Sequence, residues 1–420
     1  MSTPVVLLLS SSLLLGQAVK PKDLREMAKQ GSGAIPKLQE YLKDPALEMR
    51  LEAVKAIARI GTQHCVDPLL QATRDNDPEV QIHAVDGLVN FYLPGYLQTG
   101  IGATLKRAGS VIKARFTDVN DQVIDPYIQV RADVVEAIGK LARGGASLES
   151  RANAARAAGI LRAQGALPDL LEALRSKDSA VLYESLVALQ KIHDPAAAVK
   201  IRYLLRDLDE KVQLAAIETT GLLQNKEALS DLVDVLNRPR STAKVRRAAL
   251  TAIAMIPDES SRALYTKYLT EKDERMRAAA AEGFARLKSP ADRSMLAKAF
   301  EEEGKPSPRI SLAFALAAGG KTEIAEFSPL QLLVNTLNSK VRQGEAFAFL
   351  VELARDPGIR AKLYTGMASG TRDEKIQLAL VMARSGDQTS VAEVERLTRD
   401  GDAEVAKEAL RALRNLKARL

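Results

Sequence analysis

Three histidines and a single cysteine are the side chains in this 420-residue chain best suited to bind a metal ion. His64 and Cys65 are adjacent in a predicted turn, and His83 follows in the next predicted helix. Two imidazoles and a thiolate can bind zinc, but this spacing matches no fixed zinc-ligand pattern. One cysteine also excludes an intrachain disulfide and a cysteine-rich metal site. We therefore predict a structural role for these residues, with no metal and no cofactor.

Motifs for enzymatic chemistry are also missing from the sequence. Gly100-Ile101-Gly102 lacks the third glycine and the strand–helix context of a dinucleotide-binding loop. No serine occupies a Gly-x-Ser-x-Gly nucleophile elbow. Acid–base catalysis needs titratable groups that converge on one pocket, and no such constellation is evident. The sequence therefore predicts a non-catalytic protein.

Residues 94–125 form a basic segment, and no Asp or Glu occurs from residue 87 to residue 117. A loop of this composition is suited to contact an anionic membrane surface or an apolar protein partner. The alternative, an irregular structural unit whose apolar residues complete the core, is favoured because repeat arrays often contain such units. The candidate partner-binding residues are Tyr96, Lys106, Arg107, Lys113, Arg115 and Phe116.

A second basic stretch lies between residues 237 and 251, where five cationic side chains occur without an acidic one. Such a loop could hold a phosphate or a lipid headgroup. A solvated turn is the usual explanation of a charge run of this length. We name Arg238, Arg240 and Lys244 as a candidate anion-binding loop.

These candidates are embedded in a repeated pattern. An Asp, often followed by Pro, precedes an apolar anchor residue, and Arg or Gln commonly follows the anchor. The clearest copies begin at Asp77, Asp209, Asp273 and Asp402. The anchors lie at positions 49, 80, 181, 212, 245, 276, 308, 341, 376 and 405. Apart from the gap of 101 residues between positions 80 and 181, adjacent anchors are 29–35 residues apart, which suits a unit of two short amphipathic helices and two turns.

The residue types at each position have physical explanations. The Asp side chain caps the next helix, and a Pro in the first helical position has no N–H to leave unpaired. Gly61, Gly159 and Gly221 lie near expected helix ends, where a left-handed residue can end a helix. The Arg after the anchor is expected to pair with the turn Asp of a neighbouring unit, in a structural ladder. The arginines assigned to this ladder are Arg50, Arg131, Arg151, Arg246, Arg277, Arg309 and Arg342.

The repeats resemble the HEAT repeat family, especially its short bacterial form with Asp-Pro-x-Val-Arg spelling, as in the phycobilin lyases. The resemblance covers about residues 34–91 and 126–416. It implies an all-α fold, a right-handed α-solenoid of stacked antiparallel helix pairs with about 11–12 repeats. Residues 126–142 and 150–164 are expected to form one pair, which leaves 94–125 as an irregular insert. The fold hosts many functions, so the resemblance does not specify one.

The N-terminus predicts export. Residues 5–15 are apolar apart from three serines, and Gly16-Gln17-Ala18 forms a small-x-small cleavage pattern. This pattern indicates a signal peptide over residues 1–18, cleaved after Ala18, although no Lys or Arg precedes the apolar run. The run is too short to span a bilayer. We expect residues 19–420 to be one solenoid in the periplasm or cell envelope, or in the cytoplasm if the N-terminus is not a signal.

The net charge of +7 permits an anionic partner without requiring one. The best-supported function is a scaffold that binds a protein or peptide on a concave face, with an anionic membrane surface as a partner of the basic insert. One alternative is a basic solenoid that binds nucleic acid, which the signal peptide and the missing aromatic-plus-acid base pocket disfavour. The other is a phycobilin-lyase-like ligand chaperone, for which no cysteine or histidine arrangement is apparent.

Overall fold

The computed structural model describes residues 19–97 and 122–420. Contacts divide the chain into two compact units, Met1–Ile101 and Gly102–Leu420. Every regular element in the described residues is a helix, which confirms the predicted all-α solenoid. The predicted signal peptide, residues 1–18, lies outside the described residues.

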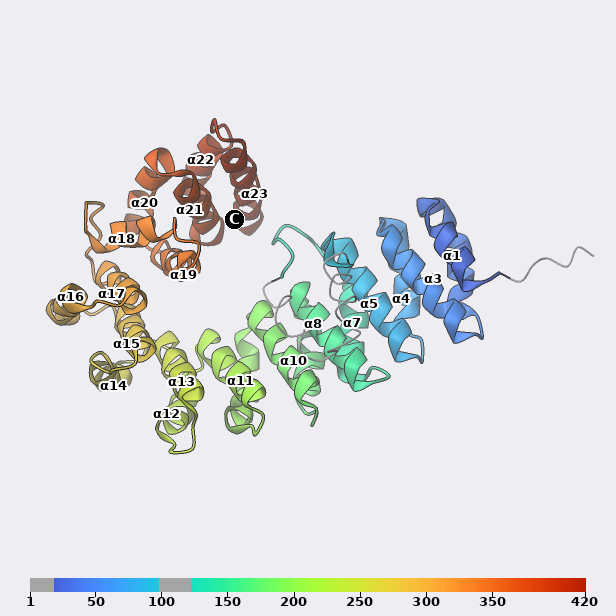
Figure 1. Cartoon of the computed structure of the whole chain (residues 1–420), viewed down its shortest axis with the longest axis horizontal. Coiled ribbons are helices and arrows are strands. Elements are labelled where there is room, and N and C mark those ends of the chain that lie inside the picture. Colours follow the sequence, from blue (N-terminus) through green and yellow to red (C-terminus); the bar gives the residue numbers. More distant parts are fainter. Residues whose placement is uncertain (1–18, 98–121) are drawn as a thin grey trace, which may run out of the picture. The chain divides into compact units, whose positions relative to one another are not determined.

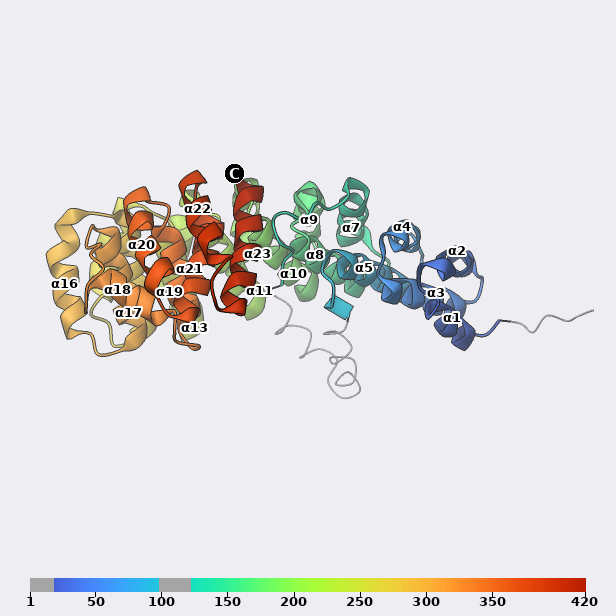
Figure 2. The same cartoon turned by 90° about the horizontal axis from the view of Figure 1, so that it is seen from above.

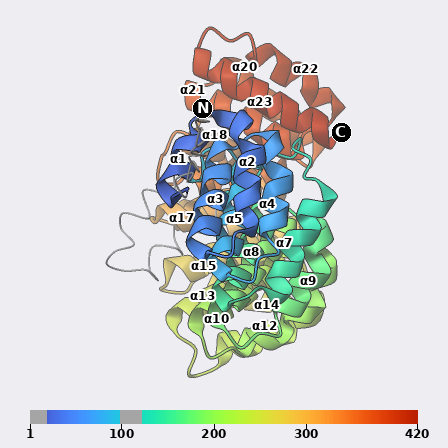
Figure 3. The ribbon, with the colours of Figure 1, turned by 90° about the vertical axis from the view of Figure 1, so that its right-hand side faces the viewer.

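The first unit contains two layers of helices, which Figure 3 shows most clearly. Its elements are α1 (Pro21–Ala28), η1 (Gly31–Ala34), α2 (Ile35–Glu40), η2 (Tyr41–Lys43), α3 (Leu47–Ile60), η3 (Gln63–Cys65), α4 (Val66–Ala72) and α5 (Pro78–Tyr92). Helix α1 packs on α3 and α3 on α5, while α2 packs on α3 and α4 on α5. The unit therefore contains two antiparallel pairs, each with a first helix and a second helix.

The second unit repeats this plan nine times, from α7 to α23. Its first helices are α7 (Ala132–Gly144), α9 (Leu167–Ala173), η6 (Pro195–Arg206), α12 (Leu229–Asn237), α14 (Arg262–Tyr268), α16 (Arg293–Glu302), α18 (Pro329–Thr336), α20 (Pro357–Ser369) and α22 (Gln388–Leu397). Its second helices are α8 (Leu148–Ile160), α10 (Ser179–Ile192), α11 (Glu210–Leu222), α13 (Ala243–Met255), α15 (Glu274–Leu287), α17 (Pro306–Ala318), α19 (Gln343–Leu353), α21 (Arg372–Ser385) and α23 (Ala403–Arg419).

Each second helix of this unit packs on the next one along the chain. Short 3-10 turns precede several first helices: η5 (Gln164–Ala166), η7 (Lys226–Ala228), η8 (Glu259–Ser261) and η9 (Pro290–Asp292). Figure 1 shows α12, α14 and α16 outside the curve of α13, α15 and α17, and Figure 2 shows the same unit from above. Two pairs in the first unit and nine in the second make eleven in the described residues, within the predicted 11–12.

Aspartate caps start five of the eleven second helices described, α5, α10, α11, α15 and α23, at the predicted aspartates. The Asp77 carboxylate accepts hydrogen bonds from the backbone N–H groups of Glu79 and Val80, at 2.9 and 3.2 Å. Asp209 caps α11 in the same way. Burial acts to raise the pKa of Asp209, but these N–H donors outweigh it and hold the pKa below its usual range. The Asp209 cap is therefore ionised at neutral pH.

The residue after the anchor has a structural role, as expected. Arg50 bonds to the Asp75 carboxylate at 2.8 Å and to the backbone carbonyl of Asp44 at 3.0 Å. Arg277 bonds to Glu303 at 2.7 Å and to the carbonyl of Glu271 at 2.8 Å. The carbonyl contact ties the second helix to the turn before it. It also explains why glutamine serves at this position, since an amide N–H can donate as well.

Other members of the predicted ladder deviate from it. Arg131 pairs locally with Asp133, because it precedes α7, which is a first helix. Arg309 donates to the carbonyls of Phe300 and Glu303. On α13, Arg246 was predicted to form the ion pair of the ladder, but it is the next residue, Arg247, that donates to the carboxylate of Asp273. The ladder is thus a set of turn contacts, and only some of them are ion pairs between neighbouring repeats.

Two of the three glycines act differently from the prediction. Gly61 ends α3 with a left-handed φ of 64°. Gly159 and Gly221 instead lie inside α8 and α11, where a Cβ atom would come within 2.8 Å of a Cα atom in the next second helix. These glycines allow close helix stacking. The left-handed conformation occurs instead at Arg162, just after α8, and at Gln224, just after α11.

Gly221→Ala is expected to destabilise the protein by about 1–3 kcal/mol, the range of overpacking in a filled core. The atom that the new methyl group meets is the Cα of Ala252, which belongs to helix backbone and cannot rotate away. Urea unfolding followed by circular dichroism measures the change. The control is Gly344→Ala on α19, where a Cβ meets no atom within 4 Å and alanine should stabilise the helix. Equal stability of the two variants would contradict the close-packing argument.

The segment before α7 differs from the predicted helix over residues 126–142, because α7 begins only at Ala132. The backbone N–H of Ile124 bonds to the carbonyl of Ile160 at 3.0 Å. The Asp125 carboxylate accepts hydrogen bonds from Arg411 and Asn415 on α23, at 3.0 and 3.2 Å. Burial acts to raise the pKa of Asp125, but these donors outweigh it and the pKa lies below its usual value. Helix α23, the last helix of the second unit, therefore contacts the segment that precedes α7, the first helix of that unit.

Candidate functional site: a basic groove on the second helices

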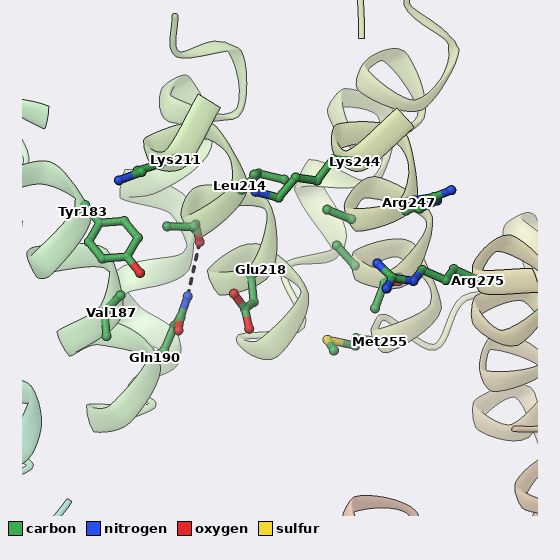
Figure 4. A pocket seen from close by; sticks show the side chains of 14 residues that line it. Tyr183, Val187, Gln190, Lys211, Leu214, Glu218, Lys244, Arg247, Met255 and Arg275 are labelled. Atoms are coloured by element: carbon green, nitrogen blue, oxygen red, sulfur yellow. Dashed lines mark hydrogen bonds between the residues drawn. The ribbon is translucent and has the colours of Figure 1, made fainter. Parts of the chain in front are cut away.

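A groove of about 660 Å³ crosses four consecutive second helices, α10, α11, α13 and α15. We call it the inner groove, and Figure 4 shows the side chains that line it. Each helix contributes because the solenoid places equivalent positions of successive repeats side by side. The groove is thus built from side chains that are about one repeat apart in sequence.

The floor of the inner groove is mostly apolar. Val187 of α10, Leu214 of α11 and Met255 of α13 line it together with small alanine side chains. Gln190 is held in place, because its amide N–H donates to Thr219 Oγ1 at 3.0 Å and to the carbonyl of Ala215 at 3.4 Å. The Glu218 carboxylate also lines the groove, between α10 and α13 (Figure 4). This floor offers contacts for aliphatic side chains and a few fixed polar groups.

Three cationic side chains form a row along the groove. Lys211, Lys244 and Arg275 each occupy the second residue of their helix, on α11, α13 and α15 respectively. All three line the groove, on successive helices in Figure 4. We call them the cationic row. Their shared position follows from the repeat, since each residue directly precedes an anchor.

A fourth cation, Arg247, is fixed by an ion pair. Its guanidinium lies 2.6 Å from the carboxylate of Asp273, the residue that caps α15. Burial acts to raise the pKa of Asp273, but the hydrogen bond from Arg247 and those from the backbone of α15 outweigh it, and the pKa is lowered. The pair therefore stays charged at neutral pH, and much of the Arg247 charge is compensated.

The cationic row opposes the local electrostatics of its helices. The first turn of a helix carries partial positive charge, so acidic side chains are favoured there and cations disfavoured. Five other second helices have an acidic residue at this position: Glu48, Glu79, Glu149, Asp373 and Glu404. Residues that break a local rule together, in one hollow of the surface, are typical of a functional site.

The predicted anion-binding loop is only partly in this site. Lys244 lies on the first turn of α13 and lines the inner groove. Arg238 and Arg240 lie in the turn before α13 and are not among the residues that line it. The sequence prediction did not include the row, because its arginine ladder concerned the residue after each anchor, whereas the row lies before it. Comparing the residue before each anchor across repeats would have shown Lys211, Lys244 and Arg275 together.

The predicted partner-binding insert is mostly beyond the described residues. Tyr96 is described and lies in the turn after α5, where its backbone N–H bonds to the carbonyl of Leu93 at 3.1 Å. Lys106, Arg107, Lys113, Arg115 and Phe116 lie outside the described residues. A role of the insert in partner binding therefore stays a prediction.

The histidine and cysteine candidates form no metal site in the part of the chain that the structure describes. Cys65 is buried, and its sulfur lies 3.6 Å from Thr62 Oγ1. His83 on α5 lies 3.9 Å from the carboxylate of Glu79, one turn away. Within residues 19–97 and 122–420, no group of three or more His, Cys, Asp or Glu side chains is placed to hold a metal ion. None of the helices described is long and apolar enough to span a membrane.

Solved structures with a similar arrangement of helices share little sequence with the chain. A complex of CpcE and CpcF of phycocyanin lyase from Nostoc sp. PCC7120 matches at 16% identity with a TM-score of 0.38, over 64% of this chain and 92% of that one. Importin beta matches at 15% identity with a TM-score of 0.38, over 94% and 65%. Human deoxyhypusine hydroxylase matches at 17% identity with a TM-score of 0.28, over 68% and 96%.

Family comparison agrees with the repeat pattern. No curated protein matches the chain. The sequence profile of the HEAT repeats matches residues 35–115 and 238–317, and the second match includes α13, α15 and α17. Both regions contain the stacked helix pairs and Asp-capped second helices described above. The chain therefore contains HEAT repeats over residues 35–115 and 238–317, and its described residues form an all-α solenoid of stacked helix pairs.

Proposed function

We propose that this protein is a non-catalytic scaffold that binds a segment of a partner protein in the inner groove. The observation that carries the proposal is the combination of an apolar floor with the cationic row in one hollow of the second helices. Its volume, about 660 Å³, falls within the range of ligand-binding clefts. Stacked repeats make extended surfaces of this kind, which suit a partner chain better than a small substrate.

The described residues of the groove support binding over catalysis. Among the groups that line it, Arg247 is fixed by Asp273 and Gln190 by Thr219. Neither is paired with a nucleophile in a way that would activate it. The groove thus offers positioned donors and apolar contacts, which are the elements of recognition.

We further propose that the scaffold acts outside the cytoplasm. The apolar N-terminal run and the Gly16-Gln17-Ala18 pattern support export, after which residues 19–420 would face the periplasm or cell envelope. In that setting the basic insert, residues 94–125, could add contact with an anionic membrane surface. Mass spectrometry of the protein from its source cells tests the location, since export requires a mature chain that begins at Val19.

Filling the groove is expected to abolish peptide binding. Ala248 of α13 lines the groove, so Ala248→Phe places a ring in the space for the partner. Peptides selected from a random display library on the full-length protein should bind this variant at least about tenfold more weakly, the loss typical of an occluded central contact. Fluorescence anisotropy measures the affinity. Ala263→Phe, on the exposed face of α14, is the matched control and should bind normally. Unchanged binding by Ala248→Phe, or no selected peptides, would refute the proposal.

A further inference from the structure

The cationic row has the arrangement of a recognition device for carboxylates. Lys211, Lys244 and Arg275 repeat at one position on three stacked helices, and the second helices on either side have Ala180 and Ser307 there. Because consecutive second helices pack directly on each other, the three charges follow one line across the groove. A partner in an extended conformation could meet all three with alternate side chains.

Two carboxylates near the row are already engaged within the fold. Glu210, next to Lys211, accepts a hydrogen bond from Thr242 Oγ1 at 3.0 Å. Asp273 accepts from Arg247 and caps α15. Lys244 and Arg275 form no ion pair with any other described residue. Lys244 and Arg275 therefore present positive charge to a ligand, whereas the N-termini of α11 and α15 are already capped by Asp209 and Asp273.

The rest of the groove distinguishes between classes of anion. Glu218 places a carboxylate beside the path of the ligand, which disfavours a continuous phosphate backbone. Among the described residues, Tyr183 is the one aromatic side chain that lines the groove, whereas surfaces for single-stranded nucleic acid stack successive bases on several rings. Val187, Leu214 and Met255 suit aliphatic side chains of a protein segment. A groove recessed between helices is also poorly shaped for a flat lipid surface.

We infer that the inner groove recognises an extended acidic protein segment, in which Asp or Glu side chains alternate with apolar ones. The inference rests on the proposed function and specifies its partner class. Acidic side chains bind the cationic row, and the apolar side chains between them contact the floor. Electrostatic attraction of this kind raises the association rate and weakens as salt is added.

The first test compares defined probes on the full-length protein. Fluorescent 12-residue peptides with alternating Glu and Leu, Gln and Leu, or Lys and Leu are titrated beside an oligothymidylate and phosphatidylserine vesicles. The Glu–Leu peptide is expected to bind tightest, at least about tenfold tighter than the Gln–Leu peptide at low salt, with a smaller difference at 0.5 M salt. Tighter binding of the oligonucleotide or the vesicles would overturn the inference.

The second test reverses the row. Lys211→Glu/Lys244→Glu/Arg275→Glu is compared with Lys177→Glu/Arg238→Glu/Arg240→Glu, whose residues do not line the groove. Each variant lowers the net charge by six, from +7 to +1, so overall charge is matched. The groove variant should lose affinity for the Glu–Leu peptide at least about tenfold, and the control less than about twofold. If both variants lost the same affinity, the peptide would be attracted by the overall charge of the protein and not by the cationic row, which would overturn the inference.

A stability measurement separates recognition from folding. Acidic residues at the second helical position complement the helix dipole, so the groove variant should melt no lower than the wild type. If the groove variant melts lower than the wild type, the variant Lys244→Gln/Arg275→Gln is used instead. It removes two charges without reversing them and should also weaken binding of the Glu–Leu peptide. Equal binding of Glu–Leu and Gln–Leu peptides would overturn the acidic specificity but leave the scaffold proposal intact. Loss of all peptide binding, including that of display-selected peptides, would instead refute the proposed function.

Discussion

Arg156→Met is expected to destabilise the protein by about 3–5 kcal/mol, the usual cost of leaving a buried charge without its partner. Arg156 lies on α8 and bonds at 2.6 Å to Glu184 on α10. The Glu184 side chain is fully buried, and that of Arg156 is 12% exposed. Without the guanidinium, the carboxylate remains inside the stack of second helices with neither water nor an opposite charge. The pair thus joins two neighbouring repeats through one contact.

A double substitution tests this interpretation. Glu184→Leu in addition to Arg156→Met should recover most of the lost stability, because apolar residues can replace a buried ion pair at little cost. Urea unfolding of both variants at pH 7 gives the free energies. The control is Lys140→Met, which breaks an exposed pair with Glu136 and should change stability by less than about 1 kcal/mol. If Arg156→Met costs no more than this control, the buried pair does not hold the repeats together.

Much of the fold could be predicted from the sequence because its signals are local. An Asp such as Asp77 caps the helix that begins at the next residue, so the cap and its target are adjacent. Anchors such as Val80 and Val212 are fully buried at the predicted spacing. The pairing of α7 with α8 was likewise predicted, as a pair of residues 126–142 with residues 150–164.

Features that depend on another repeat were harder to predict. Gly159 and Gly221 look like helix stops, but their role is set by Ala188 and Ala252 on the next second helix. Residues 126–131 look helical in isolation, yet contacts of the neighbouring Ile124 and Asp125 with α8 and α23 accompany a non-helical entry to α7. Both errors arise because stacking, which is not local, decides the outcome.

The candidate site shows the same division. Lys244 was identified from a local run of charge, and the structure places it in the groove. Arg238 and Arg240 belong to the same run but not to the groove, since only the helical position aligns with Lys211 and Arg275. A run of charged residues in the sequence does not show which side chains lie together in space, whereas residues at the same position of successive repeats lie side by side. In a solenoid, functional residues are best sought by comparing one position across all repeats.

A buried arginine farther along the second unit joins three second helices. Arg286 of α15 bonds to the carboxylate of Glu352 on α19 at 3.0 Å and to the carbonyl of Ala254 on α13 at 3.1 Å. It also lies 3.4 Å from Glu282 of its own helix. The Arg286 side chain is 11% exposed. Because α17 lies between α15 and α19 along the solenoid, this contact spans a repeat.

The pH dependence of this cluster has a defined sign. Burial raises the pKa of Glu282, Arg286 opposes that shift, and the nearby charge of Glu352 adds to it, so the pKa lies above its usual value. For a carboxyl group whose pKa is raised in the folded state, the folded state binds the proton more tightly. Its favourable contribution is therefore complete below the unfolded pKa and is lost as pH rises through the folded value.

Arg286→Met is therefore expected to destabilise the protein by about 3–5 kcal/mol at pH 7, and by less at pH 5. Losing the guanidinium removes the charge that opposes the raised pKa of Glu282, so that pKa rises further. Protonation of Glu282 on acidification then removes part of the cost. Urea unfolding at pH 7, 6 and 5 measures the difference from wild type. Adding Glu282→Gln should recover stability at pH 7 and recover less at pH 5, because glutamine supplies a neutral group at both. A difference between Arg286→Met and wild type that does not vary with pH would show that Glu282 is not the group that Arg286 holds ionised.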